Sequence, residues 1–108
     1  MSLSTHVLDA VRGAPAVGVA VELSEHDGEW WRITARGNTD QDGRIAALGE
    51  PRAGVYRVKF DTGAYFEQAG VEAFYPEVTV CFKVTDPAAH YHVPLLLSPF
   101  AFSTYRGS

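Results

Sequence analysis

The sequence has 108 residues, of which 46% are hydrophobic, and it carries a formal net charge of −4 at neutral pH. This length suits one domain spanning residues 1–108, and the apolar share is large enough for a packed core, which excludes a disordered chain. The nine Lys and Arg residues are scattered along the chain. This scatter argues against nucleic acid as a partner, because phosphate binding needs a concentrated basic surface.

Other features of the whole chain argue against a membrane protein or an exported one. The apolar runs are far too short to span a bilayer. Residues 1–4 lack a basic start followed by an apolar stretch, so we expect no signal peptide. The single cysteine, Cys81, excludes an intrachain disulfide and fits a reducing compartment. We therefore expect a cytoplasmic location.

Alternation of apolar and polar residues with a period of two predicts β-strands along most of the chain. Clusters of Gly, Pro, Asp and Asn separate the alternating runs at short intervals and predict turns. About eight short strands with regular turns are typical of an antiparallel sandwich. In chain order, we expect strands near residues 4–10, 19–24, 29–36, 43–48, 56–60, 78–84, 90–97 and 100–106.

One stretch, residues 62–70, breaks the alternation and predicts a short helix. It contains good helix formers between Thr62 and Gly70. We expect Thr62 to cap the start of this helix and Gly70 to end it.

The histidines are the first candidates for chemistry. His90 and His92 are two residues apart, so a strand points both rings to the same side. If that strand neighbours the first strand of the chain, which carries His6, three imidazoles converge. The fourth histidine, His26, lies in a turn and is expected to be solvated. Each histidine alone is better interpreted as structural, but the set indicates a site when it is joined to the polar segment 105–108. Apolar and aromatic residues run almost to Ser108, so we expect that segment to be ordered.

Several kinds of chemistry remain open on these residues. A His-x-His pair with a distant third histidine (His6, His90 and His92) suits zinc, but no nearby carboxylate would orient the rings, so a metal-free site is favoured. Arg44 follows an Asp-Gly turn and can hold a carbonyl or oxyanion through two parallel hydrogen bonds, although its spacing alone favours a solvated cation. A serine-triad hydrolase is not expected, because no Gly-x-Ser-x-Gly motif occurs.

Four segments are together similar to one family. They are residues 3–9 (Leu-Ser-Thr-His-Val-Leu-Asp), 39–44 (Thr-Asp-Gln-Asp-Gly-Arg), 74–78 (Phe-Tyr-Pro-Glu-Val) and 90–108, which closes with Tyr-Arg-Gly-Ser. Over essentially its whole length, the chain resembles the 5-hydroxyisourate hydrolases, the transthyretin-related enzymes of purine breakdown. The closing Tyr-Arg-Gly-Ser separates these enzymes from the carrier transthyretin. One mild departure is Ala101-Phe102, where Gly-Tyr is more usual.

The resemblance implies an all-β, transthyretin-like sandwich of two four-stranded antiparallel sheets with one short helix. It also implies a homotetramer, a dimer of dimers with its sites at the dimer–dimer interface. The implied reaction is hydrolysis of 5-hydroxyisourate to 2-oxo-4-hydroxy-4-carboxy-5-ureidoimidazoline in urate catabolism, without a metal or other cofactor. Carried over residue by residue, the catalytic positions are His6, Arg44, His92 and Ser108, and the substrate-binding positions are His6, Arg44, Tyr105, Arg106 and Gly107.

Physical chemistry agrees with these implied roles. An imidazole, with an ordinary pKa of about 6.5, is suited to take a proton from water at neutral pH. Arg44 beside His6 and His92 is expected to disfavour imidazolium and to bind a developing oxyanion. Which histidine takes the first proton, and whether His90 binds substrate or only supports His92, is left open. The alternative function is a non-enzymatic carrier of a small aromatic ligand, although carrier pockets are mostly apolar.

Overall fold

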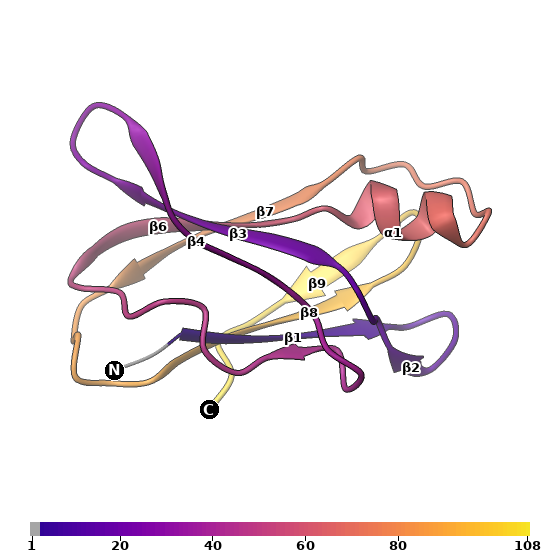
Figure 1. Ribbon diagram of the computed structural model, residues 1–108, viewed down its shortest axis with the longest axis horizontal. Helices are drawn as coiled ribbons and strands as arrows, with labels where there is room; N and C mark the ends of the chain where they lie inside the picture. Colours follow the sequence, from indigo (N-terminus) through magenta and orange to yellow (C-terminus); the bar gives the residue numbers. More distant parts are fainter. Residues whose placement is uncertain (1–2) are drawn as a thin grey trace.

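The computed structural model describes residues 3–108 as two β-sheets packed face to face, with one short helix at one end (Figure 1). The first sheet contains β1 (Leu3–Asp9), β2 (Ala14–Pro15), β5 (Arg44–Ile45), β8 (Tyr91–Leu97) and β9 (Phe102–Thr104). The second contains β3 (Ala20–His26), β4 (Trp31–Asn38), β6 (Gly54–Phe60) and β7 (Val78–Val84). The expectation about a signal peptide falls partly on residues 1 and 2, which lie outside the described residues.

The strand orders are β2-β1-β8-β9, with β5 also paired to β1, and β4-β3-β6-β7. The predicted sandwich with one helix is confirmed, with two corrections of detail. Within residues 3–108 the first sheet has five strands, because the short β2 and β5 both pair with β1. The β1–β8 pair is parallel, since no hairpin joins these strands and no turn forces them to run in opposite directions.

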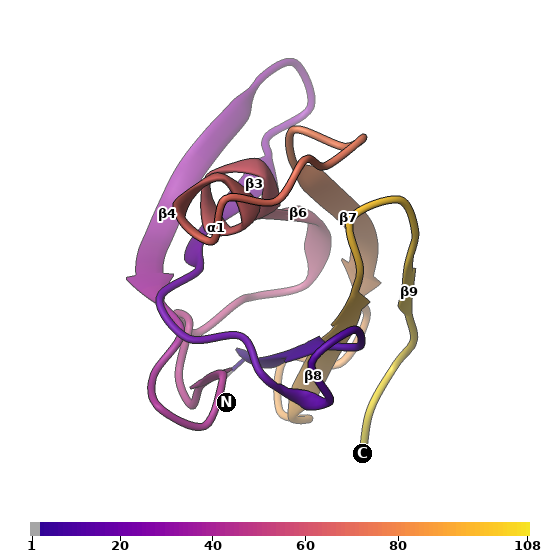
Figure 2. The same cartoon turned by 90° about the vertical axis from the view of Figure 1, so that its right-hand side faces the viewer.

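The alternation seen in the sequence separates the core from the outer surface of the first sheet. Leu3 and Val7 of β1, and Leu95 and Leu97 of β8, are at most 2% exposed and pack into the single core cluster of the described residues. The alternate side chains of β1 and β8 therefore point outward. Figure 2 shows the two layers from the helix end, with β7 and β9 on the same side of the sandwich.

The predicted helix is present as α1 (Thr62–Gln68), which lies between β6 and β7. Thr62 is its first residue rather than its cap: the cap position belongs to Asp61, and the buried Thr62 hydroxyl has no hydrogen-bond partner. Tyr65 ties the helix to the first sheet by donating its hydroxyl to the buried Asp9 carboxylate at 2.8 Å. No helix among residues 3–108 has the length and apolar character needed to cross a membrane.

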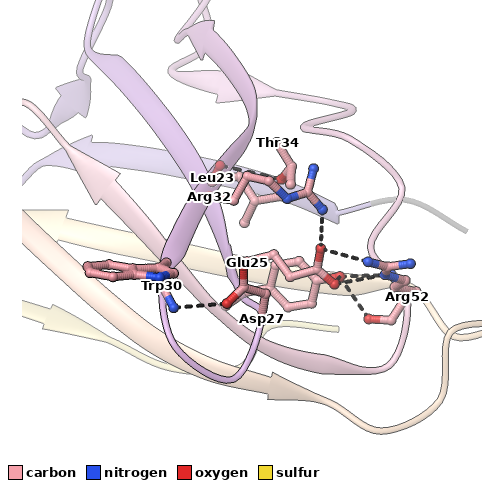
Figure 3. Close-up of polar contacts among 8 residues, drawn as sticks. Leu23, Glu25, Asp27, Trp30, Arg32, Thr34 and Arg52 are labelled. Carbon is pink, nitrogen blue, oxygen red and sulfur yellow. Dashed lines mark hydrogen bonds and ion pairs between the residues drawn. The ribbon is translucent and has the colours of Figure 1, made fainter.

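A buried carboxylate, Glu25, fastens the second sheet to the loop before β6 (Figure 3). It accepts hydrogen bonds from Arg32 at 2.9 Å and from Arg52 at 2.8 Å, and the Tyr56 hydroxyl lies 3.3 Å away. The hydrogen bond from Arg52 is the main cause that lowers the pKa of this carboxyl group. Arg32 and Arg52 therefore have a structural partner already.

Candidate functional site

Strand pairing brings the predicted site residues together on the outer face of the first sheet. The expected neighbours, the first strand and the strand of His92, are indeed β1 and β8. Their register sets Ser4 opposite His92 and His6 opposite Pro94. On the other side of β1, Arg44 of β5 stands opposite His6. One surface thus collects two imidazoles and a guanidinium from three separate segments of the chain.

The position of Arg44 is fixed by the turn before it. The Asp40 carboxylate accepts the backbone N–H groups of Asp42, at 2.8 Å, and Arg44, at 3.0 Å. Gly43 has a φ of 73°, a left-handed conformation that favours glycine, and a Cβ there would overlap the carbonyl oxygen of Val7. The Gly43 carbonyl in turn accepts the Val7 N–H at 2.7 Å. Asp40 and Gly43 therefore hold β5 against β1 and place Arg44 beside His6.

Ser4 lies between two histidines. Its Oγ is 2.7 Å from Nδ1 of His92 and 2.9 Å from Nε2 of His90. The two rings are nearly parallel, with centroids 6.5 Å apart. Ser4 is 9% exposed and His92 is half-buried, whereas His90 is exposed. The arrangement is a chain of contacts from His92 through a buried hydroxyl to a histidine at the surface.

The environment of His92 favours its neutral form. Burial is the largest cause that lowers its pKa, and the nearby positive charge of Arg44 lowers it further, followed by His6 and His90; an interaction with Ser4 acts in the opposite direction. The sequence predicted the effect of Arg44 but not that burial would be the larger cause. At neutral pH this imidazole is therefore able to accept a proton.

Arg44 differs from the other arginines of the described chain. The side chains of the other six bind carboxylates, a tyrosine hydroxyl or an aromatic face within residues 3–108: Arg12, Arg32, Arg36, Arg52, Arg57 and Arg106. Arg44 is exposed, and within the same residues its guanidinium makes no hydrogen bond, ion pair or ring contact. It is thus available for a ligand.

The segment 105–108 meets the histidines through one residue in particular. Gly107 pairs with His92, donating its N–H to the His92 carbonyl at 2.9 Å. Arg106 instead turns its guanidinium over the ring of Tyr91, 4.5 Å from the centroid. Tyr105 is 59% exposed and lines a hollow of about 240 Å³ between β7 and this segment. Ser108 is exposed and follows directly on Gly107.

The geometry also bears on the zinc alternative and on the fourth histidine. Among residues 3–108, no group of three or more His, Cys, Asp or Glu side chains is arranged to hold a metal ion. Nε2 of His90 and Nδ1 of His92 face the Ser4 hydroxyl rather than a common ligation point.

His26, expected to be solvated, is half-buried and packs on Trp31 with ring centroids 4.8 Å apart, because the hairpin folds the His26 ring back on the strand.

Sequence reasoning missed two residues of this group. Ser4 shares a strand face with His6, so the period of two contained the signal, but nothing in the sequence gave the contact with both His90 and His92. Tyr91 was missed as well: its hydroxyl accepts the N–H groups of Thr85 and Asp86 at 3.1 and 3.0 Å, which fixes the ring under Arg106. That contact depends on how the loop before β8 folds.

Comparison with known proteins adds independent findings. Residues 3–107 match the model of the HIUase/Transthyretin family. A 5-hydroxyisourate hydrolase from Salmonella dublin is 50% identical over 109 residues, covering 98% of this chain and 80% of the relative. The structure of Klebsiella pneumoniae 5-hydroxyisourate hydrolase is similar with a TM-score of 0.89 and 40% identity, covering 100% of both chains. The structure of sea bream transthyretin in complex with thyroxine is similar with a TM-score of 0.92 and 39% identity, covering 99% of this chain and 95% of that chain.

Proposed function

The chain belongs to the HIUase/transthyretin family, and from this premise we propose that residues 1–108 form one hydrolase domain that acts on 5-hydroxyisourate. The product is 2-oxo-4-hydroxy-4-carboxy-5-ureidoimidazoline, and the reaction belongs to urate catabolism in the cytoplasm. The likeness to hydrolases from Salmonella and Klebsiella supports this proposal. The observation that carries it is the guanidinium of Arg44, which makes no hydrogen bond or ion pair within residues 3–108, stands opposite His6 and is close enough to lower the pKa of His92.

His6 and His92 share the role of general base. Water is a poor nucleophile at neutral pH, and a base in hydrogen-bond reach typically contributes about 10²–10⁴-fold to the rate. His92 meets the requirement of being neutral, because burial and Arg44 lower its pKa. Its Nδ1 is engaged by Ser4, so Nε2 is the nitrogen that remains for the reaction.

Arg44 stabilises the charge that develops at the reacting carbonyl. As water attacks, a C–O bond forms and the carbonyl oxygen becomes an oxyanion, which the planar guanidinium binds through parallel hydrogen bonds. The C–N bond of the ring then breaks, and the proton taken from water passes to the leaving nitrogen through water or Ser108. Tyr105, Arg106 and Gly107 contact the substrate beside His6 and Arg44. No step of this mechanism needs a metal or cofactor.

The enzyme acts as a homotetramer, a dimer of dimers with its sites at the dimer–dimer interface. Two surfaces support this assembly. The strands β7 and β9 stand at the edges of their sheets, where unpaired backbone groups can pair with another chain. The outer face that carries His6 also presents Leu8 opposite Leu96, an apolar pair that a second dimer can cover.

A carrier remains the second candidate, favoured by the high TM-score to sea bream transthyretin with thyroxine. The distinguishing experiment follows the ultraviolet absorbance of freshly generated 5-hydroxyisourate with and without the protein. Accelerated decay that survives exhaustive chelation is expected. Decay at the spontaneous rate would support the carrier, and loss of activity on chelation would support the zinc alternative with His6, His90 and His92.

A further inference from the structure

The contact between Ser4 and two histidines has a chemical restriction built into it. A serine hydroxyl has one proton, so it donates one hydrogen bond and accepts others. The imidazole nitrogens Nδ1 of His92 and Nε2 of His90 both lie within 2.9 Å of the Ser4 Oγ. When both rings are neutral, one nitrogen must donate to the hydroxyl while the other accepts from it. The tautomer of His92 is therefore coupled to that of His90.

The base role of His92 selects one of the two directions. If Nε2 of His92 is to accept a proton, the ring must carry its hydrogen on Nδ1. Nδ1–H then donates to the Ser4 Oγ, and the Ser4 O–H donates to Nε2 of His90. A hydrogen bond on one ring nitrogen is the usual means by which a protein fixes the tautomer of a working histidine.

We propose that Ser4 is a positioning residue that fixes the reactive tautomer of His92 and links it to His90 as a proton relay. This inference rests on the proposed hydrolase function. Ser4 acts through His92 rather than on the substrate, because its hydroxyl is buried and directed at two imidazoles. The relay assigns His90 a role that neither the strand pattern nor the family resemblance supplied.

The relay moves protons without changing their number. Nε2 of His92 takes a proton from the attacking water, the Nδ1 proton of His92 passes to the Ser4 Oγ, and the former Ser4 proton passes to Nε2 of His90. His92 is then neutral in its other tautomer, and the positive charge lies on His90. When Nε2–H of His92 gives its proton toward the leaving nitrogen, the same transfers run backward and restore all three groups.

The placement of the charge gives this relay its advantage. A positive His92 would be half-buried beside Arg44 and His6, whose interactions oppose it, whereas His90 is exposed to water. Displacing the charge to the surface removes much of the desolvation cost that a cation on His92 would carry. The groups that bear on His92 are thus His6 and Ser4 on β1, Arg44 on β5, and His90 before β8.

The test compares Ser4→Ala, Ser4→Thr and His90→Gln with a control, Ser24→Ala, on β3 of the other sheet. In metal sites, loss of the partner that orients a histidine typically costs about 10–100-fold; by the same reasoning we expect kcat of Ser4→Ala to fall by about that factor while KM changes little. Ser4→Thr restores most of the rate. Because the two groups act in series, Ser4→Ala combined with His90→Gln is no slower than the slower single variant. Full kcat and an unchanged pH profile in Ser4→Ala, or multiplying losses in the double variant, would overturn the relay.

A second measurement is independent of activity. Nitrogen NMR of the wild-type imidazoles is expected to show His92 protonated on Nδ1 and bare on Nε2, and Ser4→Ala is expected to mix its tautomers. A wild-type His92 protonated on Nε2 would refute the inference even if 5-hydroxyisourate is hydrolysed. Conversely, if the wild type fails to hydrolyse 5-hydroxyisourate, the proposed function fails, and the tautomer still reports on the coupling of Ser4 to both rings.

Discussion

Gly107 lies directly against the imidazole of His92. Its N–H donates to the His92 carbonyl at 2.9 Å, and a Cβ on this glycine would overlap Cδ2 of the ring. The absence of a side chain at residue 107 is therefore what allows residues 105–108 to approach the site. Glycine serves here for close approach, since its φ is not in the left-handed region.

Gly107→Ala should consequently displace either the ring or the terminal segment. A misplacement of about 1 Å can cost roughly 10²-fold in rate, so we expect kcat/KM to fall by about that factor. The thermal midpoint should change little, because the contact lies outside the core. Ser24→Ala on β3 of the other sheet is the control and should retain activity. Wild-type activity in Gly107→Ala would mean that the contact has no catalytic consequence.

His6→Asn and His92→Asn should each lower turnover by about 10²–10⁴-fold, the contribution of a general base. The side chains differ little in size, so circular dichroism and oligomeric state should remain unchanged. His26→Asn, remote from the site on the β3–β4 hairpin, is the matched control. Near-wild-type turnover in both site variants would remove the histidine-base mechanism.

The acid limb of the kcat/KM profile should move with the charge on Arg44. In the proposed mechanism neutral His92 is the base, so activity should fall as the pH drops through the pKa of His92, and the Arg44 cation lowers that pKa. Arg44→Gln should raise the pKa and shift the limb to higher pH, besides costing about 10²–10³-fold in rate through the oxyanion. Arg44→Lys should leave the limb nearly in place. Since burial is the larger cause, the limb in Arg44→Gln should still lie below that of a free imidazole; an unmoved limb would contradict the assignment.

Glu25→Gln should destabilise the fold without touching the site. The carboxylate is 7% exposed, but the side chains of Arg32 and Arg52 are 58% and 74% exposed, so we expect a loss of only about 1–2 kcal/mol in urea unfolding. The pKa of Glu25 is lowered from 4.5. The stabilisation is therefore fully present above pH 4.5 and is lost as the pH falls through the pKa of Glu25 in the folded state. The difference from wild type should therefore shrink in acid. Glu22 forms more exposed ion pairs with Arg36 and Lys59, so Glu22→Gln should lower the free energy of unfolding by less.

The assembly can be tested at two exposed aromatic residues. Phe74 and Phe100 are 69% and 63% exposed and precede the edge strands β7 and β9, which are proposed to pair with another chain. The Phe74 N–H donates to the carbonyl of Pro99 at 2.8 Å, so both lie at one end of the sandwich. Replacing both by Glu should convert tetramers to smaller species in light scattering and lower activity in parallel. Trp30→Ser, 71% exposed on the hairpin at the other end, should leave the mass unchanged. A wild-type monomer with full activity would contradict the tetramer.

The sequence predicted most of the sandwich, because period-two alternation reports directly which side chains face a core. It could not predict the direction of the β1–β8 pair, since pairing between distant segments is set by the whole topology rather than by local pattern. The cap of α1 was misplaced by one residue, because Asp61 and Thr62 are both ordinary capping types and only the backbone distinguishes them.

The candidate site divides in the same way. The residue types at His6, Arg44 and His92 were recognisable from the sequence. The sequence also showed that these residues converge only if β1 and β8 are neighbouring strands. The bridge through Ser4 was not recognisable, because a serine on a strand is common and its meaning lies in a register that joins residues 88 positions apart. Gly107 was named through the family resemblance, but the sequence did not show that the space beside this glycine is occupied by the ring of His92.

The parallel pairing of β1 with β8 also determines when the protein can become active. A chain growing on the ribosome exposes His6 early, and β1 can pair with the short strands β2 and β5 soon afterwards, but its full-length partner β8 (Tyr91–Leu97) is synthesised much later. Local hairpins such as β3–β4 can form before then, whereas closing the long loop between β1 and β8 is entropically costly and tends to come late. The candidate site, which needs His92 of β8 beside Ser4 and His6 of β1, is therefore completed only after β8 has been synthesised.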